Sequence, residues 1–128
     1  MSRFEILSEV ALSGRLGEVP ESWLFAESDL PVSVQKVVSR LRKELNPRAI
    51  FLYGSRARET ASPTSDFDIA TLGVEDGFAW TEFRNYVTYD APTLFQIDLF
   101  RYEGSSGAFQ EGIEEDGRLV VESLLSKD

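Results

Sequence analysis

The sequence contains no cysteine and no histidine. Without cysteine the chain forms no disulfide, offers no catalytic thiol and cannot build a thiolate zinc site. Without histidine it cannot carry a Ser-His-Asp triad. Any chemistry therefore depends on carboxylates, hydroxyls, arginine and lysine, together with a hard metal ion where one binds.

Long apolar runs are also missing. Glu5 and Glu9 interrupt the only stretch that resembles the apolar part of a signal peptide. The strongest apolar run, Ala49 to Tyr53, is far shorter than the roughly 20 residues that a membrane span requires. We therefore expect a soluble, cytoplasmic protein that does not enter a membrane.

Basic residues are scarce, with 13 Lys and Arg against 22 Asp and Glu in 128 residues, a formal charge of −9. This balance argues against direct, sequence-independent nucleic-acid binding, which needs a field of basic side chains. The charge is uneven, because residues 33–58 hold seven basic residues and one acid, whereas residues 59–100 hold eight acids and one arginine. We expect Lys36, Arg40 and Lys43 to form a solvated helix face.

Periodicity predicts the secondary structure. Apolar residues from Val34 to Leu45 recur at helical spacing, with Ser33 as the expected N-cap and Asn46-Pro47 as the stop. Further helices are expected at 4–16, 78–89 and 105–116, the last with Gly117 as its C′ residue. Strands are expected at 49–53, 66–72, 94–100 and 119–121. The order predicts an α/β (α+β) fold with a small mixed β-sheet flanked by helices.

Two further aromatic features are interpreted from the pattern. Trp80 and Phe83 are expected to be core residues rather than base-stacking residues. The apolar group Trp23-Leu24-Phe25 either packs back on the sheet or contacts a partner or a second copy.

A possible phosphate turn follows the strand 49–53. Gly54-Ser55 ends this strand and leads into a short helix, an arrangement whose free N–H groups attract phosphate oxygens. Arg56 and Arg58 add positive charge beside it. A Gly-Ser pair after a strand is more often a simple turn, so this motif alone decides little.

Three carboxylates lie on the two strands that follow. Asp66 and Asp68 are two residues apart, so both point to one face of a strand. Alone they would be read as a solvated strand edge. Asp98, between core-facing Ile97 and Leu99, changes the balance, because three convergent carboxylates suit Mg²⁺, and two such ions are the usual clamp for phosphoryl displacement.

The stretch from Tyr53 to Ile69 resembles the signature of the DNA polymerase beta-like nucleotidyltransferase superfamily. More narrowly, it is similar to the minimal nucleotidyltransferase (MNT) antitoxins of HEPN/MNT toxin–antitoxin modules. The shared pattern is Gly-Ser, ten residues and Asp-x-Asp, with a later aspartate between apolar residues. The resemblance covers about residues 34–121, which suggests an N-terminal extension at 1–32 and a nucleotidyltransferase domain at 33–128.

The resemblance implies a role for each matching position. It implies catalytic and metal-ligating Asp66, Asp68 and Asp98, and nucleotide-binding Gly54, Ser55, Arg58 and Ser65. It also implies two Mg²⁺ ions, ATP as the nucleotide substrate, and transfer of AMP to a hydroxyl.

The resemblance also implies the acceptor, a tyrosine of a HEPN-domain toxin that the chain neutralises as antitoxin. Two alternatives stay open at this point. One is a small-molecule, antibiotic-type nucleotidyltransferase, and the other is a non-catalytic antitoxin that neutralises its partner by masking it.

Overall fold

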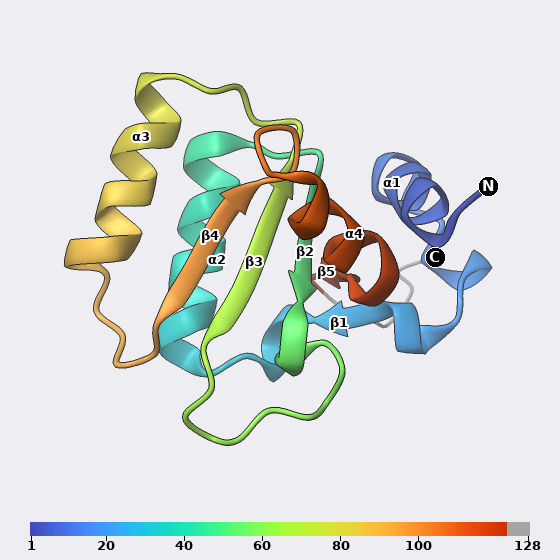
Figure 1. The fold of residues 1–128 in the computed structure, drawn as a ribbon, viewed down its shortest axis with the longest axis horizontal. Coiled ribbons are helices and arrows are strands. Elements are labelled where there is room, and N and C mark those ends of the chain that lie inside the picture. Colours follow the sequence, from blue (N-terminus) through green and yellow to red (C-terminus); the bar gives the residue numbers. More distant parts are fainter. Residues whose placement is uncertain (123–128) are drawn as a thin grey trace.

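A five-stranded sheet with the order β1-β5-β2-β3-β4 organises the molecule (Figure 1). The computed structural model describes residues 1–122. The strands are β1 (Leu24–Ala26), β2 (Ala49–Tyr53), β3 (Phe67–Leu72), β4 (Ile97–Arg101) and β5 (Arg118–Val121). Pairs β1–β5 and β3–β4 are parallel, whereas β2 pairs antiparallel with both β3 and β5. The mixed sheet confirms the predicted fold class.

Helices cover both faces of this sheet (Figure 1). They are α1 (Arg3–Ser13), α2 (Val32–Leu45), α3 (Phe78–Asn85) and α4 (Gly107–Asp116). Helices α2 and α3 pack on one face, and α1 and α4 pack on the other. The 3₁₀ turn η4 (Gly54–Arg56) follows β2 and matters for the site, and the π-helical turn η5 (Tyr86–Asp90) follows α3.

Alternation along the strands divides the core in two. In β2, Ile50 and Leu52 belong to the core under α2 and α3, while Phe51 and Tyr53 belong to the core under α1 and α4. In β3, Phe67 and Ile69 face α2 and α3. Because strand side chains alternate, the residue between them, Asp68, points to the α1–α4 face. Trp80 and Phe83 are buried, which confirms their predicted role in packing.

Helix α2 begins two residues earlier than predicted, at Val32 rather than Val34. Pro31, with φ −54° and ψ 145°, is the N-cap, so the expected Ser33 cap is wrong. The hydroxyl of Ser33 lies 2.8 Å from the hydroxyl of Thr93 instead. Proline suits this position because its fixed φ fits the entry to the first turn and the N–H that it lacks would have no partner there.

Gly117 ends α4 without the left-handed conformation expected of a C′ glycine. Its φ is −61° and its ψ is 134°, in the extended region. A Cβ at this position would lie 2.3 Å from the carbonyl oxygen of Ile113, so close approach to the helix explains the glycine. The other boundary errors are small. Helix α1 ends at Ser13 rather than 16, α4 starts at 107 rather than 105, and β4 starts at 97 rather than 94.

The N-terminal 32 residues pack onto the same sheet. Sequence periodicity did not reveal β1, a three-residue strand between two 3₁₀ turns, which pairs with β5. Leu24 is buried and Phe25 is partly buried against the sheet, so these two residues take the first of the two interpretations. Leu7 and Val10 of α1 complete the second core. Residues 123–128 of the predicted domain lie outside the described residues.

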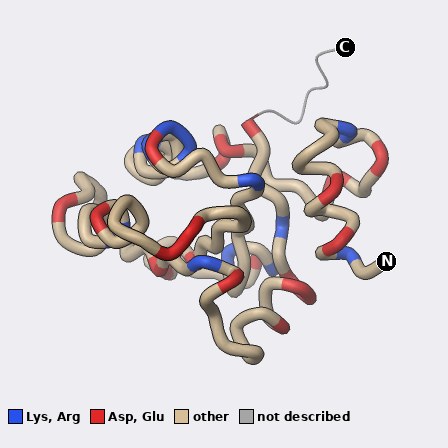
Figure 2. Tube along the Cα trace, turned by 90° about the horizontal axis from the view of Figure 1, so that it is seen from above, with Lys and Arg blue, Asp and Glu red and all other residues tan. Residues whose placement is uncertain are grey.

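Positions of Lys and Arg are spread along the chain trace (Figure 2), and α2 carries four of them. Lys36, Arg40 and Lys43 are exposed, as predicted. Arg40 pairs with Glu44 and lies 3.9 Å from the centre of the Tyr86 ring. Within residues 1–122, none of the helices combines the length and the apolar character needed to cross a membrane.

Candidate active site

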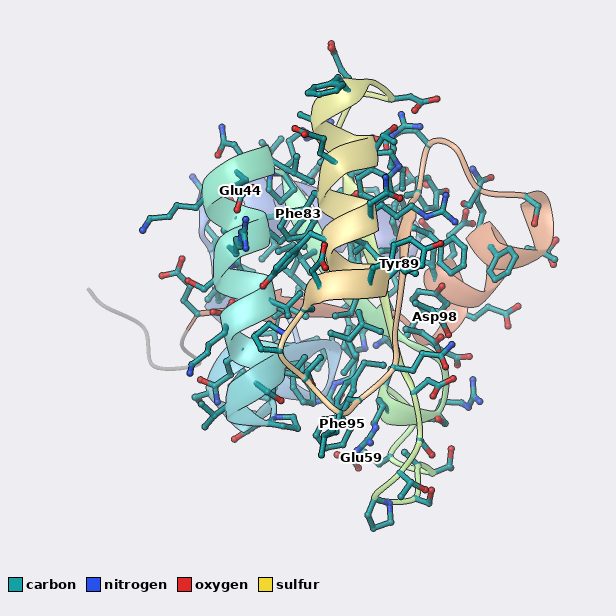
Figure 3. All side chains as sticks on the ribbon, turned by 90° about the vertical axis from the view of Figure 1, so that its left-hand side faces the viewer. Glu44, Glu59, Phe83, Tyr89, Phe95 and Asp98 are labelled. Atoms are coloured by element: carbon teal, nitrogen blue, oxygen red, sulfur yellow. The ribbon has the colours of Figure 1, made fainter. Side chains whose placement is uncertain are left out.

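A row of three side chains crosses one end of the sheet on the α1–α4 face. Strand register places Tyr53 of β2 opposite Asp68 of β3, and Asp68 beside Asp98 of β4. Figure 3, which looks onto the β4 side of the molecule, shows Asp98 on the side of α4, away from α2. Neighbouring strands lie about 4.8 Å apart, so the two carboxylates are close neighbours although 30 residues separate them in sequence.

Burial and neighbouring negative charges raise the pKa of the central carboxylate, Asp68. Burial raises the pKa of Asp68 to about 6, and the charges of Asp98 and Asp66 add to the effect. Asp66 is exposed at the end of the loop that leads into β3. A cation bound here would offset the repulsion that the carboxylates impose on one another.

Gly54 brings the phosphate turn against the same row. Its φ is +73°, a backbone conformation that glycine adopts readily. A Cβ at this position would lie 2.4 Å from Oδ2 of Asp68. Glycine is therefore required twice, by the backbone angle and by the carboxylate. The turn η4 starts here, and the N–H groups of Ala57 and Arg58 both donate to the Gly54 carbonyl.

Ser55 and Ser65 take different places. Ser55 is half-exposed on η4, and its carbonyl accepts a hydrogen bond from the N–H of Thr60. Ser65 is held within the turn 62–65, where its hydroxyl accepts a hydrogen bond of 2.9 Å from the N–H of Ser62. Ser55 thus lies in the Gly54-Ser55 turn, whereas the Ser65 hydroxyl is used in a hydrogen bond within its own loop.

The two arginines of the motif diverge. Nη2 of Arg56 donates to the carbonyls of Pro63 at 3.3 Å and Ser65 at 2.7 Å, and its guanidinium lies 4.1 Å from the centre of the Phe67 ring. Arg56 therefore clamps the loop that carries Asp66 rather than lying open beside the turn. This role has no signal in the sequence, because it depends on where the loop returns.

Arg58 lies between the phosphate turn and α4. Its Nη1 donates to Oδ2 of Asp116 at 3.0 Å. Its positive charge also acts on Asp68, whose pKa it lowers against the larger effects of burial and the other acids. Arg58 is half-exposed, so part of its donor set stays available to a ligand.

The carboxylates supply the ligand chemistry of a hard divalent cation. In the described part of the chain, no group of three or more Asp or Glu side chains is close enough together to hold a metal ion without further ligands. The donor set still fits Mg²⁺, which takes oxygen ligands and binds through one or two carboxylates together with substrate phosphates. Asp68 and Asp98 would hold the ion from adjacent strands, with Asp66 joining from the loop.

Tyr53 is a feature of the site that the sequence did not predict. Its side chain is 7% exposed, and within residues 1–122 its hydroxyl has no hydrogen-bond partner. Burial, followed by the charges of Asp68 and Asp98, raises the pKa of Tyr53, so the hydroxyl keeps its proton. A tyrosine before Gly-Ser looks like an ordinary strand residue, and only the sheet register reveals its neighbours.

Comparisons with known proteins identify the family of the chain. The family model described as Polymerase beta, Nucleotidyltransferase matches residues 35–124, a range that contains the whole site. None of the curated protein sequences matches the chain significantly.

Two solved structures are similar in fold. One is a toxin–antitoxin crystallised with AMP-PNP, with 23% identity and a TM-score of 0.54 over 70% of this chain and 72% of that one. The other is a mutant of the toxin–antitoxin MntA–HpeT that carries two Asp-to-Glu substitutions two residues apart. It has 21% identity and a TM-score of 0.50 over 66% of this chain and 68% of that one. The sheet order, the site and the extent of the family match lead to one conclusion: the chain belongs to the polymerase beta nucleotidyltransferase family.

Proposed function

We propose that this chain is a Mg²⁺-dependent adenylyltransferase that moves AMP from ATP to a tyrosine hydroxyl of a HEPN-domain toxin and thereby acts as antitoxin. The observation that carries the proposal is the placement of the Gly54-Ser55 turn directly against Asp68, with Asp98 on the next strand. A phosphate cradle and a carboxylate pair on one face are the two halves of a nucleotidyl-transfer site.

The reaction follows from these positions. The acceptor oxygen attacks the α-phosphorus of ATP, a new P–O bond forms, the bond to the β-phosphate oxygen breaks, and pyrophosphate leaves. The backbone of Gly54 and Ser55 holds the outer phosphates, and Arg58 adds positive charge beside them. Asp98 accepts the proton that the acceptor hydroxyl loses as its oxygen attacks. Bound Mg²⁺ would neutralise the phosphate charge that develops in the transition state.

The partner is inferred from two kinds of support. Both similar structures are toxin–antitoxins, and in one of them the altered aspartates have the spacing of Asp66 and Asp68. The chain carries a formal charge of −9, which suits a basic RNA-cleaving partner. Exposed Tyr89 and Leu94 lie in the segment between α3 and β4 and are apolar surface that a partner could cover.

The test is transfer of label from α-³²P-ATP to the purified toxin encoded next to this chain. We expect labelled toxin with the wild type and Mg²⁺, and no label after EDTA. The double variant Asp66→Asn/Asp68→Asn should lose about a hundredfold or more in rate, since each hundredfold corresponds to about 2.7 kcal/mol of transition-state stabilisation. The matched control is Asp76→Asn, an exposed aspartate beyond the opposite end of β3, which should transfer normally.

Failure takes two recognisable forms. If the wild type leaves the toxin unlabelled in the presence of Mg²⁺, the proposed transfer is wrong. If the double variant still neutralises the toxin fully in a growth assay, masking rather than chemistry explains the antitoxin effect.

A further inference from the structure

We propose that Tyr53 is a positioning residue of this site, whose hydroxyl donates a hydrogen bond to the carboxylate of Asp68 when Mg²⁺ and ATP are bound. The inference rests on the proposed nucleotide chemistry of the site but not on the identity of the acceptor. It assigns a function to a side chain that belongs to none of the expected catalytic or nucleotide-binding positions.

The first support is the position of the residue. Tyr53 is the last residue of β2 and precedes the phosphate turn directly, so its backbone is fixed by both elements. It stands opposite Asp68 in the antiparallel β2–β3 ladder, and both side chains point to the α1–α4 face. Directly opposite side chains of a sheet have Cβ atoms about 5 Å apart. Tyr53 is therefore an immediate neighbour of the central carboxylate.

The second support is the unused hydroxyl. Tyr53 is 7% exposed, and no described atom accepts a hydrogen bond from its hydroxyl. An unpaired buried donor is costly, and buried tyrosines usually place their hydroxyl on a partner. Tyr102, which is only partly buried, has such a partner, since its hydroxyl donates to Oε2 of Glu114. Among the described residues, four have a buried side-chain N or O atom without a partner, namely Arg3, Tyr53, Arg56 and Thr71, and Tyr53 is the one that stands opposite Asp68 in the β2–β3 ladder.

The third support is that carboxylates need hydrogen-bond donors around them when Mg²⁺ and ATP are bound. Carboxylates that bind a metal are themselves held by hydrogen bonds from a surrounding layer of donors. Asp98 already has such a donor, because Nε2 of Gln96 lies 3.2 Å from its Oδ1. For Asp68, Gly54 leaves no room on the Oδ2 side for even a methyl group. Arg58 also acts on Asp68 but is held by Asp116, whereas the buried Tyr53 hydroxyl is an adjacent donor without a partner among the described residues.

The experiment compares Tyr53→Phe with the matched control Tyr102→Phe in the full chain. Both substitutions remove one tyrosine hydroxyl and keep the ring. Affinity for ATP is measured by calorimetry with Mg²⁺ and with EDTA, and thermal stability is measured without ligand. Neither measurement uses the toxin, so a failed AMP transfer with intact ATP binding would overturn the proposed function alone.

We expect Tyr53→Phe to weaken Mg²⁺-dependent ATP binding about tenfold, the range of a hydrogen bond to a charged group. Its ligand-free melting temperature should stay the same or rise, because the variant loses only an unpaired donor. Tyr102→Phe should leave ATP affinity unchanged. Affinity of Tyr53→Phe within twofold of the wild type would overturn the inference. So would a ligand-free melting temperature lowered by about 4 °C or more, which would show that the hydroxyl already supports the empty fold.

Combining Tyr53→Phe with a substitution at Asp68 or at Asp98 identifies which carboxylate accepts the hydrogen bond. Adding Tyr53→Phe to Asp68→Ala should change ATP affinity much less than adding it to Asp98→Ala, because alanine removes the acceptor oxygen and interaction energies appear only between residues that touch. The opposite pattern would assign the hydroxyl to Asp98 and refute the inference as stated. A wild type without any Mg²⁺-dependent ATP binding would overturn this inference and the proposed function together.

Discussion

Replacing Gly54 by alanine tests how the phosphate turn and the carboxylates depend on each other. The added Cβ would lie 2.4 Å from Oδ2 of Asp68, whereas real Cβ contacts stay above about 3.0 Å. The carboxylate must therefore move by at least about 0.6 Å, the difference between these two distances. Because Oδ2 is the end of a side chain, it can move by rotating away, so the energetic cost is limited while the geometry of the site is lost.

Gly14→Ala is the matched control for the backbone. Gly14 has φ +74°, almost the angle of Gly54, but a Cβ there meets nothing within 4 Å. The left-handed conformation alone costs a non-glycine residue about 1 kcal/mol. Gly54→Ala should cost this amount and about 1 kcal/mol more for the displaced carboxylate, the range of an off-rotamer side chain. We therefore expect losses in unfolding free energy of about 1 kcal/mol for Gly14→Ala and about 2 kcal/mol for Gly54→Ala.

Urea unfolding measures these free energies, and AMP transfer is followed in parallel. Gly14→Ala should transfer normally, whereas Gly54→Ala should lose about a hundredfold, the effect of a misplacement of about 1 Å. Adding Asp68→Ala to Gly54→Ala should recover the extra 1 kcal/mol but not the activity. The reasoning is refuted if Gly54→Ala and Gly14→Ala are equally stable and equally active.

Three further predictions concern the charged groups. In metal-free buffer at pH 8, Asp68→Asn should raise the unfolding free energy by about 1–2 kcal/mol. The pKa of this carboxyl is about 6 in the fold against 3.8 in a free peptide, a difference that corresponds to about 3 kcal/mol. The partial exposure of Asp68 reduces this full effect. The protonated carboxyl is the form that the fold favours, so this gain should fade as the pH falls through 6 and vanish near 4, measured by urea unfolding. Arg56→Lys should loosen the clamp on the Ser65 carbonyl, seen as faster cleavage of residues 57–66 in limited proteolysis and a stability loss of about 1–2 kcal/mol. Arg58→Gln breaks only a half-exposed ion pair with Asp116, so stability should change by less than about 1 kcal/mol, while calorimetry should show weaker binding of ATP.

Each of these predictions has an outcome that contradicts it. A metal-free Asp68→Asn that is less stable than the wild type at pH 8 would show that the carboxylate is stabilised rather than strained. Arg56→Lys with unchanged proteolysis would remove the clamp. Arg58→Gln with normal ATP affinity would restrict Arg58 to its pairing with Asp116. Asp76→Asn serves as the control for loss of one surface carboxylate.

Local patterns in the sequence predicted most elements because the physics behind them is local. Alternation along 67–72 and the helical spacing from Val34 to Leu41 each depend on the chain's own repeat, and both elements occur as predicted. One error lies where a neighbour distant in sequence decides, because the Ser33 hydroxyl pairs with Thr93 rather than capping its helix. The other depends on backbone geometry that residue pattern does not reveal, because Gly117 is required by the nearby Ile113 carbonyl rather than by a left-handed angle.

The sequence by itself determined the chemical inventory of this protein: carboxylates without histidine or cysteine, a Gly-Ser turn and three aspartates, of which Asp68 and Asp98 stand on strands and Asp66 ends the loop before β3. Only the tertiary structure decided which of these groups meet. The ladder that joins β2, β3 and β4 places Tyr53, Asp68 and Asp98 in one row, and it turns Arg56 from a phosphate candidate into a loop clamp. The physical reason is that strand register is set by hydrogen bonds and packing between segments far apart in the chain, and a shift by one residue would turn each side chain to the opposite face.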